Sequence, residues 1–385
     1  MPLDAPSPPT TAASIAAAIG AISIVGIGLG LSIPLLAIEL DQRGVSRTWI
    51  GLNTAVGGLS TVLTAPFLPG MVRRFGTSTM LFGAIVLAML SLLGFKAVDS
   101  FVLWFPLRFL FGAALCVLFV VSEFWINSAA PPARRGLVMG IYASVLSLGF
   151  AAGPAILGMV GTQGWAPYVI GAVIFAAGAL PVMAGAAGAP EIEAHSERSM
   201  LDLLRLAPAA TMAGFIFGAV ETGQMSFLPL YGLRLGLDQQ AASLLLTVAV
   251  LGNVALQIPL GLLSDRMDRQ KLLLGCALVG LIGSASLPLF AMDGWAIRAV
   301  VFVTTGVVAG LYTVGLSLLG ARFQGAELAV ANSAFVMLYS VGLIVGPPLV
   351  GAGMDAVDPH GFAYVIAALF ALYLAVVAHG MRMRG

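Results

Sequence analysis

Three ionisable residues, Arg108, Glu221 and Glu123, lie inside long apolar stretches of this sequence. An ionisable group at membrane depth costs several kcal/mol unless it is paired or hydrated, so it marks a functional candidate. Arg108 lies roughly 10 Å and Glu221 roughly 15 Å from the nearer end of its predicted helix at 1.5 Å per residue. Glu123 has two interpretations, a cation site or an ion pair with basic residues 134 and 135. These three are the candidates for proton coupling.

Uncharged polar side chains form a second group of candidates. Glu221 and Gln224 are three residues apart, and Asn253 and Gln257 are four apart, so each pair shares a helix face. The other polar or aromatic candidates in apolar stretches are Tyr142, Asn332, Tyr339 and Trp125. Together they predict a mainly apolar site for a small molecule, with a few polar anchors. The alternative for each is a hydrogen bond between packed helices.

The composition indicates where these residues must lie. The 385-residue chain is 59% hydrophobic and 9% charged, with a mean hydropathy of +1.02. Soluble domains carry roughly 25% charged residues, so an integral membrane protein is predicted. Two cysteines in apolar runs and three histidines at or beyond helix ends argue against a disulfide framework or a metal centre. We expect no cofactor, no nucleic-acid partner and no enzymatic activity.

Twelve apolar segments are each long enough to cross roughly 30 Å of hydrocarbon. They are predicted near residues 12–38, 48–70, 77–98, 101–126, 136–160, 165–188, 207–231, 240–263, 270–291, 295–319, 327–352 and 361–379.

These segments divide the chain into two six-helix halves, 12–188 and 207–380. Residues 1–11, with four prolines, are expected to be a disordered tail, and the polar stretch 189–206 is expected to be a cytoplasmic linker. Twelve Lys and Arg residues fall on the side of the termini and five on the opposite side. The excess of positive charge predicts that both termini are cytoplasmic, in a bacterial inner membrane.

A repeated motif links the halves. The stretch LGFAAGPAILG at 148–158 returns as VGLIVGPPLVG at 341–351, shifted by 193 residues, about half of the chain. Its shared residues are Gly149, Gly153, Pro154 and Gly158 in the first copy and Gly342, Gly346, Pro347 and Gly351 in the second. Glycines four residues apart let two helices approach closely, and proline bends a helix. A smooth, bent helix suits a carrier whose halves rock, although tight packing alone explains the motif equally well.

Three motifs resemble those of the major facilitator superfamily. The turn GLLSDRMDRQK at 261–271, with Asp265 and Arg266, resembles the family's loop signature, in which an acid and neighbouring arginines latch the halves. The first-half turn PGMVRRFG has Arg73 where the family has the acid. The glycine–proline motif resembles the fifth-helix motif of the family's antiporters, and LRFLFGAA at 107–114 resembles its buried-arginine motif.

The resemblance implies an all-α fold of twelve transmembrane helices in two pseudo-symmetric halves that work by alternating access. Helices one, four, seven and ten line the cavity in that family, so Arg108 and Glu221 are expected to face each other. The leading functional hypothesis is proton-coupled export of a small hydrophobic or cationic compound by a monomer. Proton-linked uptake or facilitated transport of a sugar or organic acid, a lysolipid flippase, and a receptor or scaffold on the carrier fold are the alternatives.

Overall fold

The computed structural model describes residues 12–129, 135–185, 208–290, 294–322 and 325–382. The expected tail 1–11 and the whole of the expected linker 189–206 lie outside these ranges. In the first half the helices are α1 (Ala12–Gln42), α2 (Arg47–Thr64), α3 (Leu68–Phe75), α4 (Thr77–Ala97), α5 (Trp104–Ala129), α6 (Arg135–Val160) and α7 (Ala166–Gly185). In the second half they are α9 (Pro208–Arg234), α10 (Gln239–Arg266), α11 (Arg269–Ser286), α12 (Trp295–Val308), α13 (Gly310–Arg322), α14 (Gly325–Ala356) and α15 (Gly361–Arg382).

When α2–α3 and α12–α13 are each counted as one segment, the described helices form twelve transmembrane segments, six in each half. Nine segments of the described residues are both long and apolar enough to span a bilayer on their own. The twelve-helix, two-half architecture predicted from the sequence is therefore confirmed.

Two of these transmembrane segments are interrupted, although the sequence predicts an unbroken helix for each. The second crossing passes from α2 through a 3₁₀ turn, Ala65–Phe67, into α3. Pro66 and Pro69 each lack the N–H that an α-helix requires, which explains a tighter turn at this point. The tenth crossing divides at Ala309 into α12 and α13.

The repeated glycines bring helices together within each half. A Cβ added to Gly153 in α6 would come closer than 3.0 Å to the backbone of Gly30 in α1. A Cβ added to Gly346 in α14 would meet the backbone of Ala219 in α9 in the same way. Pro154 and Pro347 both lie inside helices, as the repeat predicts. Both glycines face a neighbour in their own half, and their helices α6 and α14 also carry the largest contacts with the other half, as the repeat predicts.

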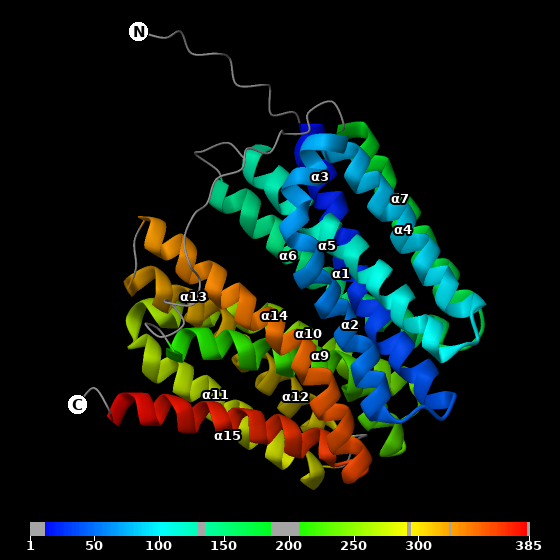
Figure 1. Ribbon diagram of the computed structural model, residues 1–385. Helices are drawn as coiled ribbons and strands as arrows, with labels where there is room; N and C mark the ends of the chain where they lie inside the picture. The colour runs from blue at the N-terminus through cyan, green and yellow to red at the C-terminus, as the bar shows by residue number, and fades with distance from the viewer. Residues whose placement is uncertain (1–11, 130–134, 186–207, 291–293, 323–324, 383–385) are drawn as a thin grey trace, which may run out of the picture.

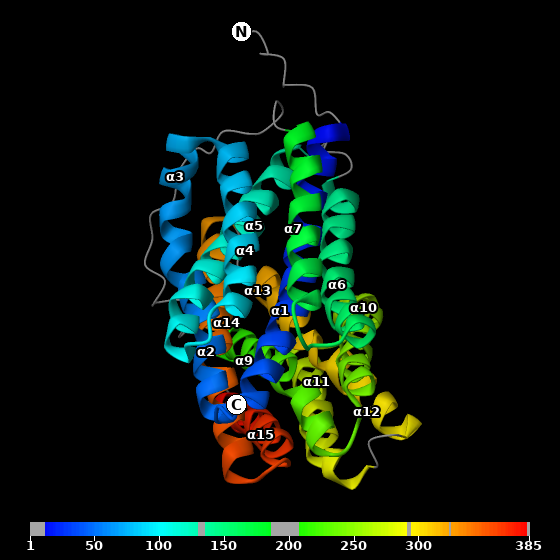
Figure 2. The same ribbon diagram turned by 90° about the vertical axis from the view of Figure 1, so that its right-hand side faces the viewer.

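Contacts between the halves gather at one end of the molecule. We call the end with the α1–α2 and α14–α15 connections the outer end, after its predicted orientation, and the opposite end the inner end. The largest contacts between halves are those of α2 with α14 and of α6 with α10. In Figure 1 the two bundles meet near α2, α9 and α14 and are inclined so that their ends near the termini diverge. Figure 2 shows α4, α5 and α7 running side by side in the first half.

Candidate functional site

A cavity lies between the two halves at mid-height. Helix α6 supplies one wall, and α9, α10 and α12 supply the others. Its lining residues are Ser147, Phe150, Phe217, Val220, Glu221, Gln224, Met225, Leu246, Ala249, Val250, Asn253, Thr305 and Val308. Among these described lining residues, Glu221 is the ionisable one. The cavity therefore has the apolar walls and few polar groups that are typical of a site for a small molecule.

Aromatic rings hold the carboxylate of Glu221 in place. The hydroxyl of Tyr339, on α14, donates a hydrogen bond of 2.6 Å to Glu221 Oε2. The ring of Tyr339 stacks on Phe217 with centroids 6.0 Å apart, and Tyr312 packs edge-on against Tyr339 at 5.6 Å. A hydrogen bond to a charged acceptor is about twice as strong as a neutral one. Tyr339 therefore both orients the carboxylate and supplies part of the aromatic surface around it.

Two further predicted polar residues reach the same cavity. Thr305 Oγ1 donates to Gln224 Oε1 at 3.4 Å. The side-chain oxygen of Asn253 is buried and has no hydrogen-bond partner among the described residues. Gln257, one turn along α10, is half-buried and is not part of the cavity lining. The side chain of Asn332, on α14, lies outside the described part of the structure. Glu221, Gln224 and Asn253 thus all line one cavity.

Tyr142 and Trp125 lie elsewhere than the sequence predicts. The hydroxyl of Tyr142 pairs with Ser122 Oγ at 3.1 Å, which joins α6 to α5. The indole of Trp125 is fully buried and donates to Ser14 Oγ at 2.6 Å, which joins α5 to α1. In this conformation both residues hold the first half together instead of lining the cavity. Their aromatic and polar character suits either role, so spacing alone does not distinguish the two.

Arg108 does not pair with Glu221 in this conformation. Its guanidinium donates to Thr54 Oγ1 at 3.1 Å and lies 6.0 Å from the ring centroid of Phe95, both within the first half. Arg108 is 4% exposed, and its Nε has no hydrogen bond among the described residues. The sequence indicates the depth of a residue along a helix, but not the direction in which that helix is turned. The expected facing pair is therefore absent here.

Glu123 occupies the inner half of α5. It is half-buried and lies within electrostatic reach of Tyr142 and Tyr312. Residue 134 and the side chain of residue 135 lie outside the described part of the structure, so the predicted ion pair at that position stays a prediction. Glu123 is not part of the cavity lining around Glu221.

The predicted latch at the inner turn shows only part of its geometry. Arg266 lies exposed in the last turn of α10, and the side chain of Asp265 is outside the described part. Asp268 caps α11 by accepting a hydrogen bond of 2.9 Å from the backbone of Lys271. Arg269 donates to Ser317 on α13 at 2.9 Å. Asp268, which stands where the family signature has glycine, is thus a helix cap.

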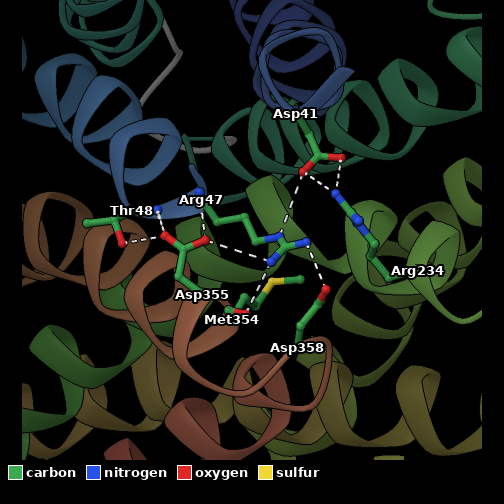
Figure 3. Close-up of polar contacts among 7 residues, drawn as sticks. All are labelled: Asp41, Arg47, Thr48, Arg234, Met354, Asp355 and Asp358. Atoms are coloured by element: carbon green, nitrogen blue, oxygen red, sulfur yellow. Dashed lines mark hydrogen bonds and ion pairs between the residues drawn. The ribbon is translucent and has the colours of Figure 1, made fainter. Parts of the chain in front are cut away.

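Sequence reasoning missed an ionic network at the outer end that joins the halves. Arg47, at the start of α2, lies 3.1 Å from Asp358 and 3.7 Å from both Asp355 and Asp41. Arg234, at the end of α9, lies 2.9 Å from Asp41. Figure 3 shows these five side chains converging from both halves. Asp41 and Arg234 are 193 residues apart, the shift of the repeat, so they occupy equivalent positions at the ends of α1 and α9.

A neighbouring acid is buried where a solvated position would be expected at the end of the first helix. Glu39 is 6% exposed. It accepts hydrogen bonds from Tyr168 at 2.6 Å, Arg43 at 2.7 Å and Lys96 at 2.9 Å. This cluster ties α1, α4 and α7 together within the first half, so the first half is firmly joined at its outer end.

Two six-helix repeats around a central, mainly apolar site are the architecture of many secondary transporters. The family model described as Major Facilitator Superfamily matches residues 18–238 and 210–382, and the chain belongs to this superfamily.

The relatives and solved structures agree with that class. An uncharacterized MFS-type transporter, YfkF of Bacillus subtilis (strain 168), is 28% identical over 363 residues, 92% of this chain and 93% of the relative. A crystal structure of a bacterial homologue of the human lysosomal transporter Spinster, inward-facing and unoccupied, has a TM-score of 0.75 at 13% identity, covering 97% of this chain and 96% of its own. A variant of the nucleoside transporter NupG has a TM-score of 0.76 at 14% identity, covering 96% and 99%.

Proposed function

We propose that this transporter exports small hydrophobic or cationic compounds in exchange for protons. The observation that carries the proposal is the position of Glu221, the ionisable residue among the described lining of an otherwise apolar cavity between the halves. Apolar walls suit the body of a hydrophobic compound, and the carboxylate suits its positive charge. One chain supplies both halves and the whole cavity lining, which favours a monomeric carrier.

Coupling of proton and substrate transport follows because the carboxylate of Glu221 can bind only one of them at a time. Glu221 can neutralise its charge with a proton or with a bound cation, and each excludes the other. An uncompensated charge in an apolar site is costly, so the halves exchange positions most easily when Glu221 carries one of the two. Proton and cation then move in opposite directions. Tyr339 keeps the carboxylate oriented toward the shared space in both states.

The direction of transport is inferred from the conformation. The halves are joined at the outer end and diverge toward the inner end, which carries the termini. With the predicted orientation, a compound reaches Glu221 from the cytoplasm. The loaded carrier turns to its outward-open state, where a proton from the more acidic outer side replaces the compound on Glu221. The protonated carrier then returns to the inward-open state and releases the proton into the cytoplasm.

Purified protein in vesicles with an acidic interior tests this proposal. We expect added tetraphenylphosphonium, a hydrophobic cation, to enter the vesicles while a pH-sensitive dye inside reports loss of protons. Empty vesicles under the same gradient are the control. Xylose or a nucleoside that moves protons in its own direction, with no response to the cation, would contradict export by exchange and establish symport.

We predict that Tyr339→Phe weakens binding of the cation about ten- to a hundredfold. The change keeps the ring that stacks on Phe217 and removes the hydroxyl that donates to Glu221. A hydrogen bond to a charged group contributes about 1.5–3 kcal/mol, and about 1.4 kcal/mol corresponds to a tenfold change. Calorimetric titration of the purified variant measures the effect. Tyr312→Phe, which keeps the neighbouring ring and leaves the bond to Glu221 intact, is the control.

A further inference from the structure

The first turn of α2 takes its cap from the other half of the protein. Ser46 occupies the N-cap position, yet its side chain makes no capping hydrogen bond. Asp355, on α14, accepts hydrogen bonds from the backbone N–H of Arg47 at 3.0 Å and of Thr48 at 2.8 Å. It also accepts one from Thr48 Oγ1 at 2.7 Å. A carboxylate that accepts bonds from first-turn N–H groups is an N-cap, and the helix dipole favours its charge.

The same carboxylate lies within the ionic network of Arg47. The guanidinium donates to the backbone oxygen of Met354 at 3.3 Å and to Asp358 at 3.1 Å. The side chain of Arg47 is 11% exposed, whereas that of Asp358 is 43% exposed. Figure 3 shows Asp355 between the backbone of α2 and this guanidinium, so it is the group that contacts both. Asp355 is thus held by the backbone of α2 on one side and by the guanidinium of Arg47 on the other.

The second repeat lacks this arrangement at the equivalent place. Its helix α10 begins at Gln239 and has a cap of its own, Asp238, which accepts from the backbone of Ala241 at 2.7 Å. The residue 193 positions before Asp355 is Thr162, which accepts a hydrogen bond from the side chain of Gln239. The fold therefore places α6 against the start of α10 with a neutral contact. A charged cap shared between halves is a specific feature of α14 and α2.

We propose that Asp355 is the gating residue of the outer end, where it closes the passage by capping α2 from the opposite half. Opening to the outer side then requires Asp355 to leave the start of α2. The released N–H groups and the carboxylate lie at the protein surface, where water replaces the lost hydrogen bonds. The gate is for that reason reversible and of moderate strength. This inference rests on the transporter class and not on the identity of the substrate or on proton coupling.

A distance measurement across the outer end tests the gate. Val102, which is 72% exposed in the first half, and Trp295, which is 82% exposed in the second, are replaced by cysteine and spin-labelled in lipid nanodiscs. The native cysteines, Cys116 and Cys276, are buried. Pulsed electron resonance then gives the populations of short and long distances, which correspond to a closed and an open outer end.

We expect Asp355→Ala to raise the ratio of open to closed populations about five- to tenfold, the effect of losing a helix cap. Asp355→Asn keeps a capping oxygen and should give a smaller rise. Asp358→Ala is the matched control, because it removes a neighbouring carboxylate from Arg47 and leaves α2 capped. It should change the ratio less than twofold, as expected for an exposed ion pair.

An unchanged ratio in Asp355→Ala, or equal rises in Asp355→Ala and Asp358→Ala, would overturn the proposal. Equal rises in Asp355→Asn and Asp355→Ala would show that Asp355 acts through its charge and not as a helix cap, which would overturn the proposal. Each variant is first checked for a single symmetrical peak in size-exclusion chromatography. If Asp355→Ala fails this check, Asp355→Asn against Asp358→Asn makes the same comparison, and a shift no larger at position 355 overturns the proposal.

Discussion

Glu221→Gln is expected to reduce transport driven by a pH gradient to the level of empty vesicles. Glutamine keeps the size of the side chain and an oxygen that accepts the hydrogen bond from Tyr339, but it cannot take up or release a proton. The cavity should therefore stay intact while the link between proton and substrate is lost. Fluxes of protons and of the hydrophobic cation are measured in the same vesicles.

The residual behaviour of this variant distinguishes coupling from folding. Ligand binding or exchange without a gradient should remain measurable in Glu221→Gln, because the apolar walls are unchanged. Glu123→Gln is the matched control, since it neutralises a second carboxylate outside the cavity lining. Transport at the wild-type rate in Glu221→Gln would refute the role of this residue, and a loss confined to Glu123→Gln would move the coupling site to α5.

Gly51→Ala is expected to disfavour closure of the outer end. A Cβ at Gly51 would come closer than 3.0 Å to the backbone of Pro347 and Pro348 in α14, across the boundary between the halves. Backbone atoms cannot turn aside as a side chain can, so α2 must separate from α14. Overpacking costs about 1–3 kcal/mol, which corresponds to a roughly five- to hundredfold shift toward the outward-open state. Transport should fall in proportion, because the inward-open state becomes rare.

Gly57→Ala supplies the control on the same helix, since a Cβ there would have no atom within 4 Å. Both variants lose one glycine from α2, so they share any effect of glycine on helix stability. The spin-label pair at residues 102 and 295 reports the outer distance in each. Wild-type distances and transport in Gly51→Ala would contradict the close contact of α2 and α14.

Much of the fold was predictable because the length of an apolar segment and the recurrence of a motif can be read directly from the sequence. Twelve apolar segments, the paired glycine–proline motifs and the polar break between the halves each follow from a few consecutive residues. The interruptions within the second and tenth transmembrane segments were less predictable. Pro66 lies in the 3₁₀ turn that ends α2. Membrane helices also tolerate proline without a break, and α6 continues through Pro154.

The candidate site was predictable only in part. Glu221, Gln224 and Asn253, which the sequence suggests as members of one site, all line the same cavity. Polar residues at membrane depth seldom lack a partner or a function, which is why the sequence draws attention to them. Arg108 has the same property, yet it faces Thr54 in its own half. Depth along a helix is a matter of counting residues. The direction of a side chain depends on how each helix is rotated against its neighbours.

The sequence by itself determined that this protein crosses the membrane twelve times as a duplicated unit with ionisable residues inside its apolar segments. Only the tertiary structure decided which charges meet. Asp355 and Arg47 lie 308 residues apart and belong to different repeats, so no local pattern relates them. Their contact exists because α14 packs against α2 at the outer end. The packing of the two halves therefore decides which of these charged residues meet.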